Sequence, residues 1–149
     1  MMKVSKSYVD VRFLVLFSLF FLYSGCAPKS NYLVGDGGGP YKMILFTEGN
    51  KWVPGNPTEM SFQLVDSRTD KPIKNLQLAH ERLMHIFITD ERLEYFAHVH
   101  VSEKSNEQGV TEGRYYVNHT FERPGFYRLV VEFVHLNRIW HKSFTLPVI

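Results

Sequence analysis

The sequence has 149 residues, of which 44% are hydrophobic and 15% aromatic, enough apolar material for the core of one domain. Its net charge of +2 arises in the first 25 residues, which contain Lys3, Lys6, Arg12 and Asp10. Without them the 17 basic and 15 acidic side chains each fall to fourteen, so the rest of the chain is neutral. A neutral chain without a basic stripe excludes nucleic acid as a partner, because phosphate binding needs a positively charged surface.

The N-terminal segment predicts a bacterial lipoprotein signal. Basic residues are followed by an apolar run over 13–23 with a single polar interruption. This run is about half of the roughly 20 residues that span a bilayer, and its length is typical of a signal peptide. It leads to Ser24-Gly25-Cys26, which resembles a lipobox, where the cysteine is lipidated and becomes the mature N-terminus. We therefore expect a signal peptide over residues 1–25 and a lipid anchor at Cys26.

The residues after the cysteine indicate location and flexibility. Ala27, in place of an aspartate, points to the outer membrane of a Gram-negative cell, so we expect a protein of the bacterial cell envelope that faces the periplasm. Residues 26–40 include three consecutive glycines, and we interpret them as a flexible tether between lipid and domain. Cys26 is the only cysteine, so no disulfide within the chain can stabilise the domain.

From residue 41 onward the hydrophobic pattern has the period of a β-strand. Met60, Phe62 and Leu64 alternate with polar residues, as expected for a half-buried strand. The other predicted strands cover residues 41–47, 78–89, 95–101, 114–121, 126–134 and 139–148, with turn-forming residues between them. Short strands at regular spacing predict an all-β fold over residues 41–149: a single immunoglobulin-like antiparallel β-sandwich of about seven strands.

Candidate metal ligands are concentrated in one predicted hairpin, and they are His80, Met84, His85, His98 and His100. His98 and His100 are two residues apart, so both project from the same face of a strand. If the numbers of facing residues add up to an odd sum, His85 lies on that face as well. If the sum is even, Met84 lies there instead, together with His80. The sequence leaves both registers open.

These side chains predict a transition-metal site. Imidazole binds copper and zinc, and a thioether shifts the preference toward copper(I). We expect a protein that binds copper, with zinc as the alternative ion, for metal handling or delivery. The alternative hypothesis is a structural or protein-interaction lipoprotein without a metal site, in which the histidines are structural and a sheet edge or loop docks a protein partner. His119, His135 and His141 lie apart from the hairpin and are interpreted as solvated or structural.

An enzyme is not expected. The motif His80-Glu81-Arg82-Leu83-Met84-His85 superficially suggests a zinc protease. That chemistry needs histidines at positions i and i+4 on one face of a helix, whereas here the second histidine is at i+5 in a segment that favours a strand. The chain also lacks a Gly-x-Ser-x-Gly motif for a nucleophilic serine.

The hairpin and the strand at Gly125 to Tyr127 resemble the YtkA-like domain, a family of secreted or lipid-anchored bacterial domains. The matching positions are His80, Glu81, Met84, His85, Leu93, Phe96, His98 and His100. The resemblance covers residues 41–149. It implies an immunoglobulin-like sandwich, related in architecture to CopC-type copper proteins, and a role in handling copper or other heavy metals. The sequence departs from the family at Val101, where proline often follows the second histidine.

Overall fold

A computed structural model describes residues 32–47, 52–102, 109 and 111–149 of the chain. Within these residues it contains eight strands: β1 (Tyr32–Val34), β2 (Tyr41–Thr47), β3 (Pro57–Asp66), β4 (Met84–Asp90), β5 (Phe96–His100), β6 (Arg114–Thr120), β7 (Gly125–His135) and β8 (Arg138–Val148). The predicted signal peptide and the anchor at Cys26 lie outside the described residues. No helix in the described part of the chain is both long and apolar enough to cross a bilayer.

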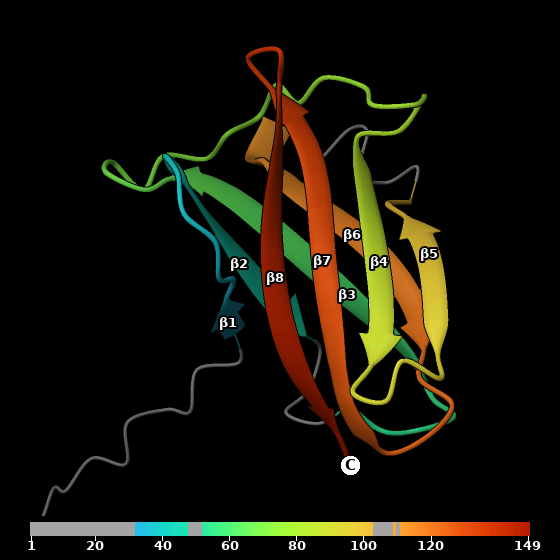
Figure 1. Cartoon of the computed structure of the whole chain (residues 1–149). Coiled ribbons are helices and arrows are strands. Elements are labelled where there is room, and N and C mark those ends of the chain that lie inside the picture. Colours follow the sequence, from blue (N-terminus) through green and yellow to red (C-terminus); the bar gives the residue numbers. More distant parts are fainter. Residues whose placement is uncertain (1–31, 48–51, 103–108, 110) are drawn as a thin grey trace, which may run out of the picture. The chain divides into compact units, whose positions relative to one another are not determined.

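The strands form two antiparallel sheets that pack face to face (Figure 1). Sheet A has the order β1-β2-β3-β6, and sheet B has the order β5-β4-β7-β8. Alternate residues of the strands point between the sheets and are buried, as the period of two predicts. The core includes Met43, Leu45, Met60, Phe62, Leu64, Ile86, Ile88, Tyr115, Leu129, Val131 and Phe133. The predicted all-β antiparallel sandwich is therefore confirmed.

The strand order is that of the immunoglobulin fold. Strands β2, β3 and β6 take the places of strands A, B and E, while β5, β4, β7 and β8 take those of C′, C, F and G. The hydroxyl of Tyr127, near the start of β7, donates a hydrogen bond to the carbonyl oxygen of Arg123 at 3.0 Å. This is the position and the bond of the tyrosine corner found in such sandwiches.

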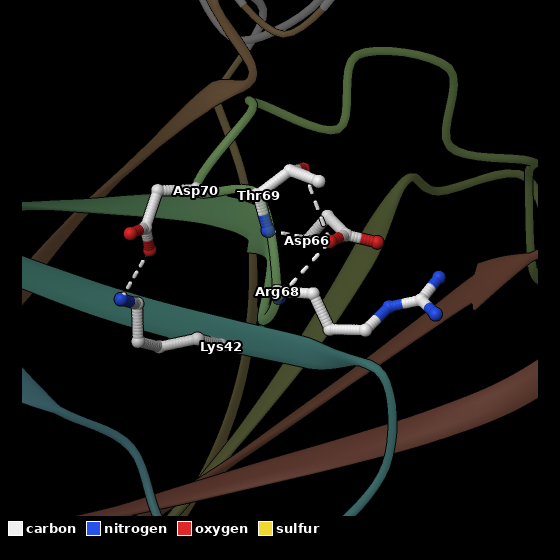
Figure 2. Close-up of polar contacts among 5 residues, drawn as sticks. All are labelled: Lys42, Asp66, Arg68, Thr69 and Asp70. Carbon is white, nitrogen blue, oxygen red and sulfur yellow. Dashed lines mark hydrogen bonds and ion pairs between the residues drawn. The ribbon is translucent and has the colours of Figure 1, made fainter.

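A turn closed by one carboxylate ends β3 and starts the crossing from sheet A to sheet B. Asp66 accepts hydrogen bonds from the backbone N–H of Thr69 at 2.9 Å, from that of Arg68 at 3.0 Å, and from the Thr69 hydroxyl (Figure 2). These bonds hold the pKa of Asp66 below its ordinary value. Lys42 of β2 contacts Asp70 at the same turn, so the turn is joined to the neighbouring strand.

The expectation of a flexible tether over residues 26–40 is wrong for its described part. Residues 32–34 form β1, which pairs with β2 in sheet A, and Asp36 then forms a bridge to Ser143 of β8 in sheet B. The segment therefore joins the edges of both sheets. The remaining residues of the expected tether, 26–31, lie outside the described part of the chain.

The consecutive glycines have a packing role that the sequence does not reveal. Gly39 has a φ of 101°, and a Cβ atom there would come within 2.7 Å of the Trp140 ring. The ammonium group of Lys142, a buried residue of β8, donates hydrogen bonds to the carbonyl oxygens of Gly37 and Gly38. The chain can approach β8 this closely because Gly37 and Gly39 have no side chain, and this packing is the physical reason why the segment is not a tether.

Candidate metal centre

The β4–β5 hairpin brings three histidines onto the outer face of sheet B. Its register pairs His85 with His100 and Phe87 with His98, so facing residues add up to 185, an odd number. In such a register His85 lies directly opposite His100 and diagonally from His98 on the same face. The ligand nitrogens of these three histidines all lie within 4.8 Å of one another. The structure therefore contains a histidine cluster that could hold a metal ion.

One pair of the cluster already has the spacing of two ligands of one ion. Nδ1 of His85 and Nε2 of His98 are 3.0 Å apart. Two imidazole nitrogens that each lie 2.0–2.1 Å from a metal are separated by about 2.9–3.4 Å, depending on the angle at the ion. His100 completes the group, with its ring centroid 4.9 Å from that of His85 and 4.6 Å from that of His98.

A backbone carbonyl group orients His85. Nε2 of His85 lies 2.8 Å from the carbonyl oxygen of Ala79, which can only accept a hydrogen bond. Nε2 must therefore carry the proton, and in the neutral ring the lone pair is on Nδ1, which faces His98. In metal sites, a bond of this kind to the outer nitrogen sets the tautomer and orientation of a ligating histidine.

A strained turn positions the carbonyl group of Ala79 next to His85. The backbones of Ala79 and Arg82 exchange two hydrogen bonds, of 2.8 and 3.0 Å, around the two-residue loop of His80 and Glu81. Both loop residues have positive φ, 46° and 67°, as a type I′ turn requires. Glycine and asparagine are the residues that favour these positions. The predicted strand 78–89 is thus interrupted by a turn, and β4 begins only at Met84.

His80 lies near the cluster but is not one of its three members. It is exposed on the turn, and its ring centroid is 6.1 Å from that of His85. The expectation that His80 shares a face with Met84 does not hold, because the turn separates His80 from the regular alternation of β4.

Met84 is not part of the histidine cluster. Its exposed fraction is 0%, and it is a member of the hydrophobic core, on the opposite face of β4 from His85. The expectation that Met84 supplies a thioether ligand is therefore corrected. The physical reason is that adjacent residues of a strand point to opposite faces, and the odd register places His85 on the face of His98 and His100. Met84 shares its parity with Ile86 and Ile88, so the hydrophobic pattern of β4 contains a signal for this placement.

Burial within the cluster increases toward the centre of the sheet. His85 is only 5% exposed, although it lies on an outer face, because the turn at Ala79 covers it. His100 is half-buried and His98 is exposed. Burial and, to a smaller extent, the neighbouring His98, His85 and Arg82 lower the pKa of His100 below its ordinary value. This favours the neutral form of imidazole, which is the form that binds a metal.

Aromatic rings restrain the exposed member of the cluster. The Phe87 ring stacks on the His98 ring with a centroid distance of 4.6 Å and an interplanar angle of 23°. Phe87 in turn stacks on Phe96, which is 66% exposed. The Phe87 ring therefore limits the rotation of His98, which is exposed.

Comparisons with known proteins place the chain in a family. A family model described as a domain of unknown function, DUF8832, matches residues 37–149. The chain belongs to the DUF8832 family. No curated protein matches the sequence. Among solved structures, the fold is similar to the PKD domain of the human VPS10 domain-containing receptor SorCS2, with 12% identity, a TM-score of 0.38, and coverage of 100% of this chain and 94% of that domain.

The three remaining histidines of this DUF8832 chain lie in other contacts. His119 is 3.1 Å from the hydroxyl of Tyr95 through Nε2, and His135 is 2.6 Å from the hydroxyl of Tyr41 through Nδ1. His141 forms an ion pair of 2.8 Å with Glu132 when it is protonated. Their interpretation as structural or solvated side chains is consistent with these contacts.

Two groups near the cluster of the DUF8832 domain were not found from the sequence. The carbonyl oxygen of Ala79 belongs to the backbone, so the pattern of side chains does not predict its role. Glu132 lies on β7 directly opposite His85, so that His100, His85, Glu132 and His141 form one row across sheet B. Only the pairing of strands distant in sequence creates this row.

Proposed function

We propose that this domain binds one transition-metal ion, copper(II) in preference to zinc, through His85, His98 and His100. The observation that carries the proposal is the contact between His85 and His98. The nitrogens are 3.0 Å apart, and the bond to Ala79 leaves the lone pair of His85 on the nitrogen that faces His98. A bound ion would take the place of the proton between the two rings and draw in His100.

The donor set supports the choice of ion. Three neutral imidazoles suit copper(II) and zinc, and for a given set of nitrogen ligands copper(II) binds more tightly than zinc. A copper(I) site would gain from a thioether, but Met84 is buried in the core. The resemblance to the YtkA-like domain, which implies copper handling, points in the same direction.

We further propose that the protein is a lipoprotein of the bacterial cell envelope, anchored through Cys26 in the outer membrane and facing the periplasm. The support is the order of basic residues, apolar run and lipobox-like residues in the sequence. In that setting the domain would bind, hold or pass on a metal ion near the membrane.

We place the domain among binding proteins and not among enzymes. Metal-assisted hydrolysis needs a free base beside an open coordination position. In the described part of the chain, Glu132 is opposite His85 but is paired with His141, and Glu81 is exposed on the turn. Neither carboxylate is placed to activate a water molecule on the ion.

The test is a calorimetric titration with copper(II) and zinc. It uses the mature chain with Cys26→Ser, which removes the lipid, and compares it with a His98→Ala, His100→Ala double variant. We expect one copper(II) ion per chain and a loss of at least a hundredfold in affinity in the double variant. His141→Ala is the matched control, because His141 lies on the same outer face but outside the cluster, and it should bind like the unmodified domain.

Electron paramagnetic resonance of the copper(II) complex provides a second readout, since three coordinated imidazoles produce nitrogen hyperfine structure. Equal binding by the domain and its double variant, or no binding by either, contradicts the proposed site. That result would favour a domain that docks a protein partner and uses its histidines structurally.

A further inference from the structure

The outer face of sheet A carries a surface that the metal site does not use. Strand pairing aligns two adjacent rows of residues across this sheet. One row consists of Tyr32, Phe46, Ser61 and Tyr116, and the other consists of Val34, Ile44, Gln63 and Arg114. We call these eight residues the sheet A face. Its side chains are mainly aromatic and aliphatic, with one cation. The rows on either side of it on the same outer face contain Lys42 and Glu59.

The apolar part of this face that lies on β1 is open to solvent. Tyr32 is 47% exposed and Val34 is 52% exposed. The Tyr32 ring contacts the Phe46 ring at a centroid distance of 6.0 Å, and the guanidinium carbon of Arg114 lies 4.7 Å from the centre of the Phe46 ring. Tyrosine and arginine beside exposed aliphatic side chains are typical of surfaces at the boundary between water and lipid.

The chain length between the proposed anchor and β1 is short. Five residues separate Cys26 from Tyr32, which is already part of a strand. A fully extended chain covers at most about 3.3–3.6 Å per residue, so over six steps Tyr32 can lie no further than about 22 Å from a lipidated cysteine. The end of the sandwich that contains β1 is thus kept close to any membrane that holds the lipid.

We propose that the sheet A face rests on the lipid surface beside the anchor and turns the histidine cluster away from the membrane. This inference rests on the lipid anchor of the proposed function and does not depend on the metal. The sheet A face and the histidine cluster lie on the outer faces of opposite sheets, which point in opposite directions in a sandwich. Contact of sheet A with lipid therefore leaves His85, His98 and His100 accessible from the aqueous side.

The experiment uses the lipidated full-length protein in its cell envelope, with p-benzoylphenylalanine, a photoreactive amino acid, in place of Phe46 or Tyr32. The matched control carries the same amino acid in place of Phe96, which is exposed on the outer face of sheet B. After irradiation, mass spectrometry separates adducts with phospholipid from adducts with protein. The two test positions guard against a folding defect at one of them, because Tyr32 is more exposed than the half-buried Phe46.

We expect lipid adducts at positions 32 and 46 to be at least fivefold more abundant than at position 96. Equal lipid labelling on both faces, or adducts with protein instead of lipid at positions 32 and 46, overturns the inference and leaves the anchor intact. The intact mass of the purified protein shows whether Cys26 carries lipid. A chain without lipid overturns the anchor and this inference together, so the two failures are distinguishable.

Discussion

The carbonyl oxygen of Ala79 accepts a hydrogen bond of 2.8 Å from Nε2 of His85, across the turn that precedes β4. The same oxygen also accepts the backbone N–H of Arg82 at 3.0 Å, so one acceptor both closes the turn and orients the ring. The turn keeps His80 and Glu81 at positive φ, which costs of the order of 1–3 kcal/mol for each such residue. The protein thus maintains backbone strain next to its most concentrated group of imidazoles.

Replacing His80-Glu81 with Asn-Gly tests the role of this turn. Because Asn-Gly is the preferred pair for a type I′ turn, we expect the free energy of unfolding to rise by about 1–2 kcal/mol in the absence of metal. Urea unfolding measures this change. Copper affinity within a factor of three of the unmodified domain shows that His80 is not a ligand. A larger loss of affinity would place His80 in the site as a fourth ligand.

Substitutions of Met84 separate a core side chain from a metal ligand. Met84→Leu preserves volume, so we expect a loss of less than about 1.5 kcal/mol in unfolding free energy and unchanged copper affinity. Met84→Ala leaves a cavity in the hydrophobic core, and should cost about 2–5 kcal/mol. A fall in copper affinity of tenfold or more in the folded Met84→Leu variant would contradict the placement of Met84 in the core.

Acidification should destabilise the metal-free domain through His119 and His135, and the lowered pKa of His100 acts in the same direction. Burial lowers the pKa of His119 and His135 below their ordinary value of 6.5. Between that value and the lower pKa values of the folded state, the unfolded chain binds more protons, so stability is greatest above pH 6.5 and is lost as the pH falls. Urea unfolding with a chelator present at pH 7.5 and pH 5 measures the loss.

Replacing His119 and His135 with Gln should reduce this dependence, because an amide does not titrate in that range, and should leave the part that His100 contributes. His80→Gln is the control. This substitution also removes one histidine, but from an exposed position on the turn. Parallel pH profiles for the domain and the double variant would show that the loss of stability arises elsewhere.

The local pattern of the sequence was sufficient for the fold class. The alternation seen at Met60, Phe62 and Leu64 specifies which side chains are buried, and the turn residues between strands specify where the chain reverses. For the same reason the spacing of His98 and His100 was enough to place both on one face. These properties depend on residues that are close in sequence, so they can be derived without knowledge of the sheet.

Contacts that exist only in the folded chain decided the remaining features. Whether His85 or Met84 joins His98 depends on the register of the hairpin, and a shift of one residue would exchange them. Gly39 packs against Trp140 although about a hundred residues separate them in the chain, and contacts of this kind distinguish a packed glycine segment from a tether. The bond from His85 to Ala79 involves a backbone acceptor. Every residue carries such an acceptor, so the residue type at position 79 does not predict the bond. Side-chain alternation is a local property of the backbone. Register and loop packing, in contrast, depend on the free energy of packing the whole core, and that packing exists only in the folded chain.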